Sequence, residues 1–132
     1  MANSVKVLIV DDEAYIRRVV ELKLANKGYE VITATNGEDG LEKFKLFHPE
    51  IVITDIKMPG MDGRALCEQI QNAKNQIPCL IIVVTCSVSD ESFEWLEKLD
   101  AKLLEKPFSP SRLLDIIDEF LKNKKSCKSK PE

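Results

Sequence analysis

Residues 5–12 read VKVLIVDD, a short apolar run that ends in two adjacent aspartates. The run is rich in β-branched residues and lacks polar alternation, which is typical of a strand buried on both faces of a sheet. Residues 31–34, 51–54 and 79–85 repeat this pattern, and residues 102–105 are a weaker example. The chain therefore contains five candidate strands, which other elements must cover on both faces.

Apolar residues at helical spacing follow each of these strands. The sets are Ile16, Val20 and Leu24, then Leu41, Phe44 and Phe47, then Ala65, Leu66 and Ile70, then Phe93, Trp95 and Leu96, and finally Leu113, Ile116, Ile117 and Phe120. Gly28 can end the first helix, Asn36 can cap the second, and Ser109-Pro110 suits the start of the last. Alternating strands and helices predict parallel strands joined by right-handed crossovers. The expected fold class is α/β, a three-layer sandwich.

The overall composition argues against several classes of protein. The 132 residues include 19 basic and 22 acidic side chains, whereas domains that bind nucleic acid through bulk charge are strongly basic. No apolar run approaches the roughly 18–20 residues of a membrane span, and the N-terminus lacks the features of a signal peptide. The four cysteines form no Cys-x-x-Cys pair and His48 is the single histidine, so zinc is not expected. We expect a cytoplasmic protein with reduced thiols that binds neither nucleic acid directly nor a membrane.

The end of the chain differs in composition from the rest. Residues 122–132 hold five lysines and have no apolar face. We expect one domain over residues 4–122, and a basic flexible tail or the start of a linker over residues 123–132. On this prediction the chain itself holds no effector domain.

Residues with reactive or metal-binding side chains stand where four of the predicted strands end. Asp11 and Asp12 follow the first strand, Asp55 follows the third, Thr85 ends the fourth and Lys106 follows the fifth. In an open parallel sheet, ligands bind beyond the carboxyl ends of the strands, where the strand order changes direction. We therefore expect these side chains to converge on one edge of the sheet.

Three converging carboxylates restrict the chemistry of that edge. Two carboxylates about 4 Å apart repel by roughly 4 kcal/mol at an effective dielectric constant near 20, so three require a cation. Oxygen ligands favour a hard ion, and without a Ca²⁺-binding loop the expected ion is Mg²⁺. Mg²⁺ beside a carboxylate and a lysine suits phosphoryl transfer. No serine or cysteine has a neighbouring histidine base, so we expect a carboxylate nucleophile and an aspartyl phosphate.

These residues, together with DIKMPGMDG at 55–63 and KPF at 106–108, resemble the receiver domain of two-component response regulators. The resemblance covers about residues 4–122. It implies a flavodoxin-like (βα)5 fold with a parallel five-stranded sheet in the order 2-1-3-4-5. It also implies a signalling module with slow self-dephosphorylation rather than an enzyme acting on an external substrate.

The resemblance assigns roles to the metal-binding and phosphoacceptor residues. Asp55 would accept a phosphoryl group from a histidine kinase or phosphotransfer protein. Asp12, Asp55 and the backbone carbonyl of Lys57 would bind Mg²⁺ directly, and Asp11 would act mostly through water. Thr85 would contact the phosphoryl oxygens.

The resemblance also concerns the fifth strand and the partner surface. Lys106 would contact the phosphoryl oxygens, and its bond to Pro107 would be cis. Lys57 and Ser87 occupy positions that tune the dephosphorylation rate in this family. A downstream effector would dock on the fourth helix, fifth strand and fifth helix, and the chain could be a monomer or a homodimer. Leu103 stands where receivers carry an aromatic residue, so we expect activation to move Thr85 and the loop after it with little aromatic reorientation.

Three alternatives remain at this point. The chain could be the N-terminal receiver of a larger regulator with a DNA-binding or catalytic output domain. A Mg²⁺-dependent phosphohydrolase of the haloacid dehalogenase type would carry Asp-x-Asp after its first strand, whereas this chain has Asp11-Asp12-Glu13. An FMN-binding flavodoxin would need a phosphate-binding loop there instead of acidic residues.

Overall fold

The predicted alternation of strands and helices is confirmed. A computed structural model describes residues 5–56, 60–73, 79–85, 94–99, 101–106 and 109–129. The elements in chain order are β1 (Lys6–Val10), α1 (Ala14–Asn26), β2 (Glu30–Ala34), α2 (Gly37–Phe47), β3 (Ile51–Asp55), α3 (Gly63–Ala73), β4 (Leu80–Thr85), α4 (Glu94–Leu99), β5 (Lys102–Glu105) and α5 (Pro110–Ser129).

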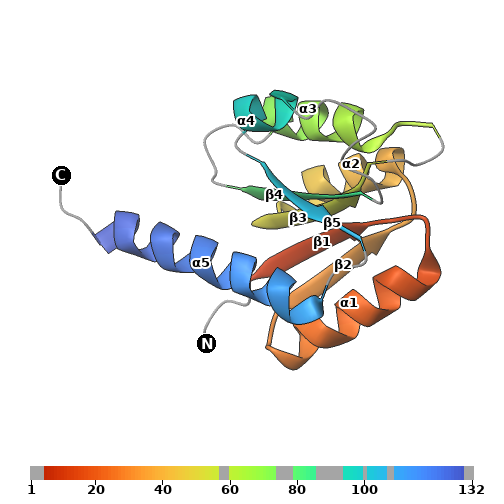
Figure 1. The fold of residues 1–132 in the computed structure, drawn as a ribbon. Coiled ribbons are helices and arrows are strands. Elements are labelled where there is room, and N and C mark those ends of the chain that lie inside the picture. The colour runs from red at the N-terminus through yellow and green to blue at the C-terminus, as the bar shows by residue number, and fades with distance from the viewer. Residues whose placement is uncertain are drawn as a thin grey trace.

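The strands form one parallel sheet in the order β2-β1-β3-β4-β5, as the resemblance implies. Helices α1 and α5 cover one face of the sheet, and α2, α3 and α4 cover the other (Figure 1). Each face has its own apolar core, one centred on Leu8, Val52 and Ile81 and the other on Ile9, Ile53 and Ile82. The fully buried β3 and β4 explain why their sequences show no polar alternation.

Local signals in the sequence set the helix boundaries that the structure has. Gly28 follows α1 with a φ of 93°, a backbone conformation that suits glycine. The side chain of Asn36 caps α2 by accepting a hydrogen bond of 2.8 Å from the backbone N–H of Asp39. The hydroxyl of Ser109 accepts a bond of 3.1 Å from the N–H of Ser111 at the start of α5. These capping predictions are confirmed.

The register of the sheet brings the polar strand ends to one edge. Val10 pairs with Thr54, Asp55 with Val84, and Thr85 with Glu105, so four strands end at nearly the same level. In the sheet, β1 lies between β2 and β3. The chain therefore moves to one side of β1 to form β2 and to the other side to form β3, so the strand order changes direction between β1 and β3. A crevice at such a switch point is where open α/β sheets bind ligands.

Helix α5 continues well beyond the sheet, as Figure 1 shows. It ends at Ser129 and so runs into the lysine-rich stretch that the sequence assigns to a tail or linker. The division into a domain over residues 4–122 and a tail over residues 123–132 stays a prediction. Within the part of the chain that the structure describes, no helix combines the length and apolar character needed to cross a membrane.

Candidate functional site

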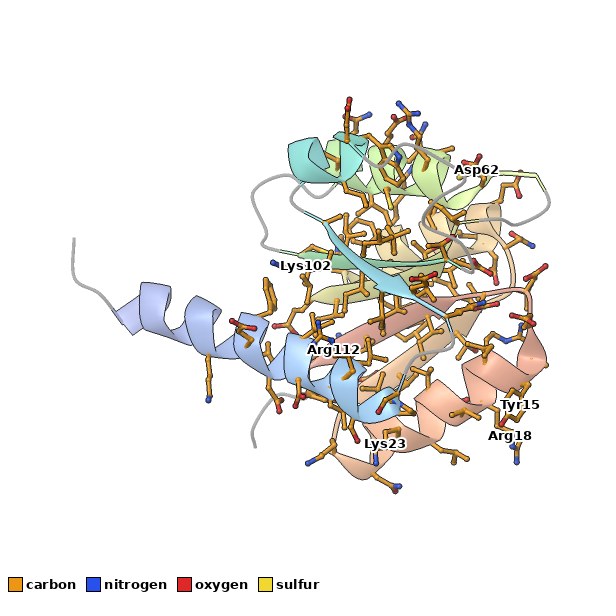
Figure 2. The ribbon with its side chains drawn as sticks, viewed as in Figure 1. Tyr15, Arg18, Lys23, Asp62, Lys102 and Arg112 are labelled. Carbon is orange, nitrogen blue, oxygen red and sulfur yellow. The ribbon has the colours of Figure 1, made fainter. Side chains whose placement is uncertain are left out.

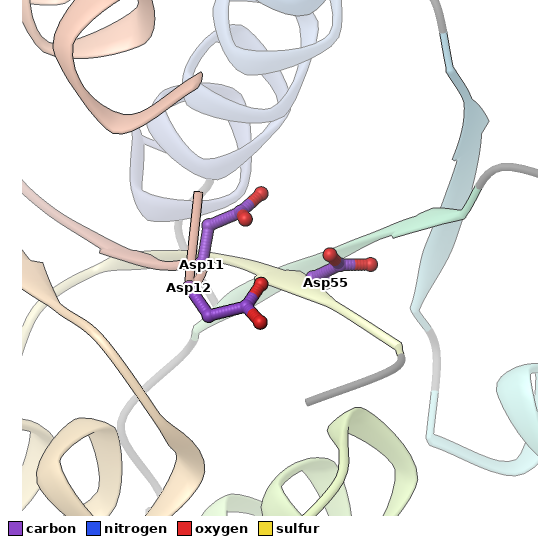
Figure 3. A group of neighbouring side chains, drawn as sticks. All are labelled: Asp11, Asp12 and Asp55. Carbon is purple, nitrogen blue, oxygen red and sulfur yellow. The ribbon is translucent and has the colours of Figure 1, made fainter. Parts of the chain in front are cut away.

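Three carboxylates meet where β1 and β3 end. Asp11 and Asp12 follow β1 and Asp55 ends β3, and one oxygen of each lies within 4.8 Å of the others (Figure 3). Asp11 and Asp55 are buried, whereas Asp12 is exposed. The predicted convergence of these residues is confirmed, and we call the three residues the aspartate cluster.

Hydrogen bonds hold the backbone and side chain of Asp11 in place. Its N–H donates to the carbonyl of Ala34 at 3.1 Å, and Arg17 donates from Nη1 to its carbonyl oxygen at 2.7 Å. Its Oδ1 accepts a bond of 2.9 Å from the N–H of Glu13. The turn from β1 into α1 therefore presents the Asp11 carboxylate in a defined position.

Asp55 is held equally closely at the end of β3. Its Oδ1 accepts a bond of 2.7 Å from the N–H of Ile56, and its carbonyl oxygen accepts one of 2.9 Å from the hydroxyl of Thr54. Gly63 packs directly on this backbone, since a Cβ atom there would overlap the carbonyl oxygen of Asp55. Asp62 caps the following helix by accepting a bond of 2.9 Å from the N–H of Ala65. The glycine and the capping aspartate together explain the start of α3 beside Asp55.

Lys106 reaches the aspartate cluster from the end of β5. Its Nζ lies 3.3 Å from Asp11 Oδ2, 3.2 Å from Asp55 Oδ2 and 2.9 Å from Glu13 Oε1. The predicted approach of Lys106 to the carboxylates is thus confirmed. Sequence reasoning missed Glu13, although its position directly after the aspartate pair is a signal that could have identified it.

The electrostatics of the cluster show a shortage of positive charge. Burial raises the pKa of Asp11, and the nearby charge of Asp55 raises it further, against the lowering effects of the Glu13 N–H and Lys106. Burial by itself lowers the pKa of Lys106, but its bond to Glu13 and the charges of Asp11 and Asp55 outweigh burial and raise it. One ammonium does not compensate the carboxylates, so this oxygen-only donor set fits a hard divalent cation.

Thr85 lies at the same edge, buried at the end of β4. The N–H of Lys106 donates to its carbonyl oxygen at 2.7 Å, which ties the two strand ends together. Leu103 on β5 packs half-buried against the core beneath α3 and α4. The expected motion of Thr85 without aromatic reorientation stays a prediction. Among the other sequence-derived candidates, Lys57, Ser87 and Pro107 lie outside the described residues.

Comparisons with known proteins identify a family. A family model described as the response regulator receiver domain matches residues 7–118. A probable transcriptional regulator ycf27 of Cyanophora paradoxa is 38% identical over 120 residues, which are 91% of this chain and 49% of that protein. The alkaline phosphatase synthesis transcriptional regulatory protein PhoP of Bacillus subtilis is 34% identical over 108 residues, 80% of this chain and 43% of that protein. The chain spans about half the length of these curated relatives.

Solved structures agree with the sequence matches. The chemotaxis protein CheY4 of Vibrio cholerae has a TM-score of 0.77 and 32% identity, covering 89% of this chain and 98% of that one. A response regulator receiver domain protein from Clostridium thermocellum has a TM-score of 0.83 and 28% identity, covering 93% and 98%. The family match, the sheet order and the structural neighbours together confirm the resemblance found in the sequence. The chain belongs to the family of response regulator receiver domains.

Proposed function

We propose that the chain is a phosphoacceptor switch in which Asp55 receives a phosphoryl group from a histidine kinase or a phosphotransfer protein. One observation carries this proposal. Asp55 Oδ2 lies 3.2 Å from Lys106 Nζ, and the Asp55 carboxylate also belongs to the aspartate cluster. A carboxylate that lies beside an ammonium and a site for a hard cation suits a nucleophile in phosphoryl transfer.

The proposed reaction forms an acyl phosphate on Asp55. One carboxylate oxygen of Asp55 forms a bond to the phosphorus atom of the donor. The bond from phosphorus to the donor's nitrogen or oxygen breaks, and the leaving group keeps that electron pair. Attack of water on the phosphorus later restores the carboxylate and releases inorganic phosphate. This slow self-dephosphorylation resets the switch without turnover of an external substrate.

We assign Mg²⁺ to the aspartate cluster, because the receiver family generally binds this ion and oxygen ligands suit it. In this proposal Asp12 and Asp55 bind directly and Asp11 binds mostly through water. The backbone carbonyl of Lys57 is a further ligand on the basis of the family resemblance. When bound, the ion neutralises negative charge on the phosphoryl oxygens.

Thr85 and Lys106 are proposed to contact the phosphoryl oxygens. Phosphorylation adds about −1.5 to −2 charge, and hydrogen bonds to charged groups contribute about 1.5–3 kcal/mol each. Two such contacts supply roughly 3–6 kcal/mol, and a swing from 1:99 to 99:1 between two states needs about 5.5 kcal/mol. The two contacts suffice when both form only in the active state.

The partner surface is proposed to comprise α4, β5 and α5. A hollow lies between β5 and α5, and its lining includes Lys102, Leu103, Arg112 and Phe120. Lys102 and Arg112 project from β5 and α5 respectively (Figure 2). A face with apolar and charged side chains suits an effector or a second copy of the chain.

The full-length protein is proposed to be a cytoplasmic transcriptional regulator. Its curated relatives are named as transcriptional regulators, and the chain spans about half of their length. A DNA-binding output domain joined to this receiver would give phosphorylation an effect on transcription, with no direct contact between this domain and nucleic acid.

The phosphoacceptor proposal is tested by incubating the protein with Mg²⁺ and acetyl phosphate and measuring its intact mass. We expect one phosphoryl group on the wild type and none on Asp55→Asn. Asp115→Asn is the matched control, because this exposed carboxylate on α5 lies outside the cluster. An unmodified wild type, or an Asp55→Asn variant modified as readily as the wild type, would end the proposal. Steady turnover of a phosphomonoester would instead favour the phosphohydrolase.

A further inference from the structure

Every hydrogen-bond donor of the Lys106 ammonium has a carboxylate within reach. An ammonium carries three N–H donors, and Nζ lies within 3.3 Å of Asp11, Glu13 and Asp55. Before Asp55 is modified, a phosphoryl oxygen of the donor that is to contact Lys106 must therefore replace one of these three acceptors. Which acceptor leaves affects how readily the phosphoryl group engages the site.

The three acceptors differ in how firmly they are held. The side chains of Asp11 and Asp55 are only 4% and 11% exposed, and each has its Oδ1 tied to a backbone N–H. The side chain of Glu13 is 59% exposed. Among the described residues, the carboxylate of Glu13 accepts no hydrogen bond other than the one from Lys106. Loss of the ammonium costs Glu13 the least of the three, because water can solvate its exposed carboxylate, whereas Asp11 or Asp55 would be left as a buried charge with less compensation.

Glu13 is also the acceptor that a metal ion affects least. Among the described residues, the group able to bind a metal comprises Asp11, Asp12 and Asp55 and does not include Glu13. A cation shared by the aspartates weakens their attraction for Lys106. The shortest of the three contacts, 2.9 Å to Glu13, is then the main competitor for the ammonium.

We propose that Glu13 is a displaceable partner of Lys106, which occupies the ammonium in the unphosphorylated chain and yields it to the phosphoryl group. Glu13 acts through Lys106 and is a positioning residue, not a catalytic one. The inference rests on the proposed phosphoacceptor function and adds a residue that sets how easily a donor engages the site.

Removing the charge of Glu13 should make donor binding easier. The phosphoryl group of a donor must displace Glu13 before transfer, so the cost appears in binding rather than in the saturated rate. For Glu13→Gln we expect the half-saturating concentration of acetyl phosphate to fall about two- to fivefold, with the saturated rate unchanged. This range equals about 0.4–1 kcal/mol, as measured for ion pairs with an exposed partner.

The control variants separate this effect from a general change in charge. Glu21→Gln removes the same charge from an exposed position further along α1 and should leave the kinetics as in the wild type. A double-mutant cycle with Lys106→Met tests whether Glu13 acts through the lysine. With methionine at position 106, Glu13→Gln should no longer alter the half-saturating concentration.

The experiment measures the initial rate of aspartyl phosphate formation against acetyl phosphate concentration at constant ionic strength and saturating Mg²⁺. Circular dichroism confirms that each variant is folded. Equal half-saturating concentrations in wild type and Glu13→Gln would overturn the inference, as would a fall that persists in the Lys106→Met background. A wild type that acquires no phosphate instead contradicts the phosphoacceptor function, so the two failures are distinguishable.

Discussion

Asp11→Asn should stabilise the metal-free protein, although it removes one partner of a buried ion pair. One oxygen of each carboxylate lies within 4.8 Å of the others, and unit charges at that limit repel by about 3.5 kcal/mol at an effective dielectric constant of 20. Asp12 and Asp55 together therefore repel Asp11 by about 7 kcal/mol. The attraction to Lys106 Nζ at 3.3 Å offsets about 5 kcal/mol of this repulsion. Solvent and salt screen the exposed Asp12, which reduces the remaining net repulsion on Asp11. We therefore expect the free energy of unfolding of the variant to exceed that of the wild type by about 1–2 kcal/mol.

The stability gained by Asp11→Asn should depend on pH. Burial, with repulsion from Asp55, raises the pKa of Asp11 above its ordinary value of 3.8. In the wild type, protonation of Asp11 favours the folded state, because the folded protein holds this proton more tightly than the unfolded chain does. This contribution to stability is fully present below the ordinary pKa and is lost as the pH rises through the raised pKa of the folded state. The difference in stability between variant and wild type should therefore be largest near neutral pH and small below about pH 4.

Urea unfolding followed by circular dichroism in EDTA measures this difference. Asp115→Asn, an exposed charge removal on α5, should stay within about 0.5 kcal/mol of the wild type. Saturating Mg²⁺ should reverse the order, because the wild type binds the ion more tightly and gains more stability from it. A variant that is less stable than the wild type in EDTA at neutral pH would refute the claim that the cluster lacks positive charge.

Two further substitutions test the surroundings of the site. Gly63→Ala should cost about 1–3 kcal/mol in urea unfolding, because its Cβ overlaps the backbone of Asp55. It should also slow acetyl phosphate labelling, and a normal labelling rate would contradict the role of this close contact. Arg64→Ala removes a guanidinium 5.6 Å from the ring centroid of Trp95, the single tryptophan, and should cost about 0.5–1 kcal/mol. The tryptophan emission of the variant should differ from that of the wild type, and an unchanged spectrum would argue against the contact between Arg64 and Trp95.

Much of the fold follows from local patterns in the sequence. Buried parallel strands lack polar alternation, and caps such as Asn36 act within a few residues of the helix they begin. Strand order does not follow from local patterns. Alternation of strands and helices implies parallel strands and right-handed crossovers, but it does not specify which strands are neighbours. The order 2-1-3-4-5 came from the family resemblance, and the structure confirms it.

The candidate site divides in the same way. The positions of Asp11, Asp55 and Lys106 after their strands are visible in the sequence, since the edge of a parallel sheet collects the residues that follow its strands. The contact between Glu13 and Lys106 joins residues 93 positions apart, and it depends on two flexible side chains meeting across the site. Asp11 and Asp12 are adjacent in the sequence, and packing of the chain buries the first and leaves the second exposed. The residues that directly follow the strands set which chemical groups reach this edge of the sheet. Which of these groups are buried, paired or free to leave depends on tertiary packing, because desolvation and long-range contacts exist only in the packed chain.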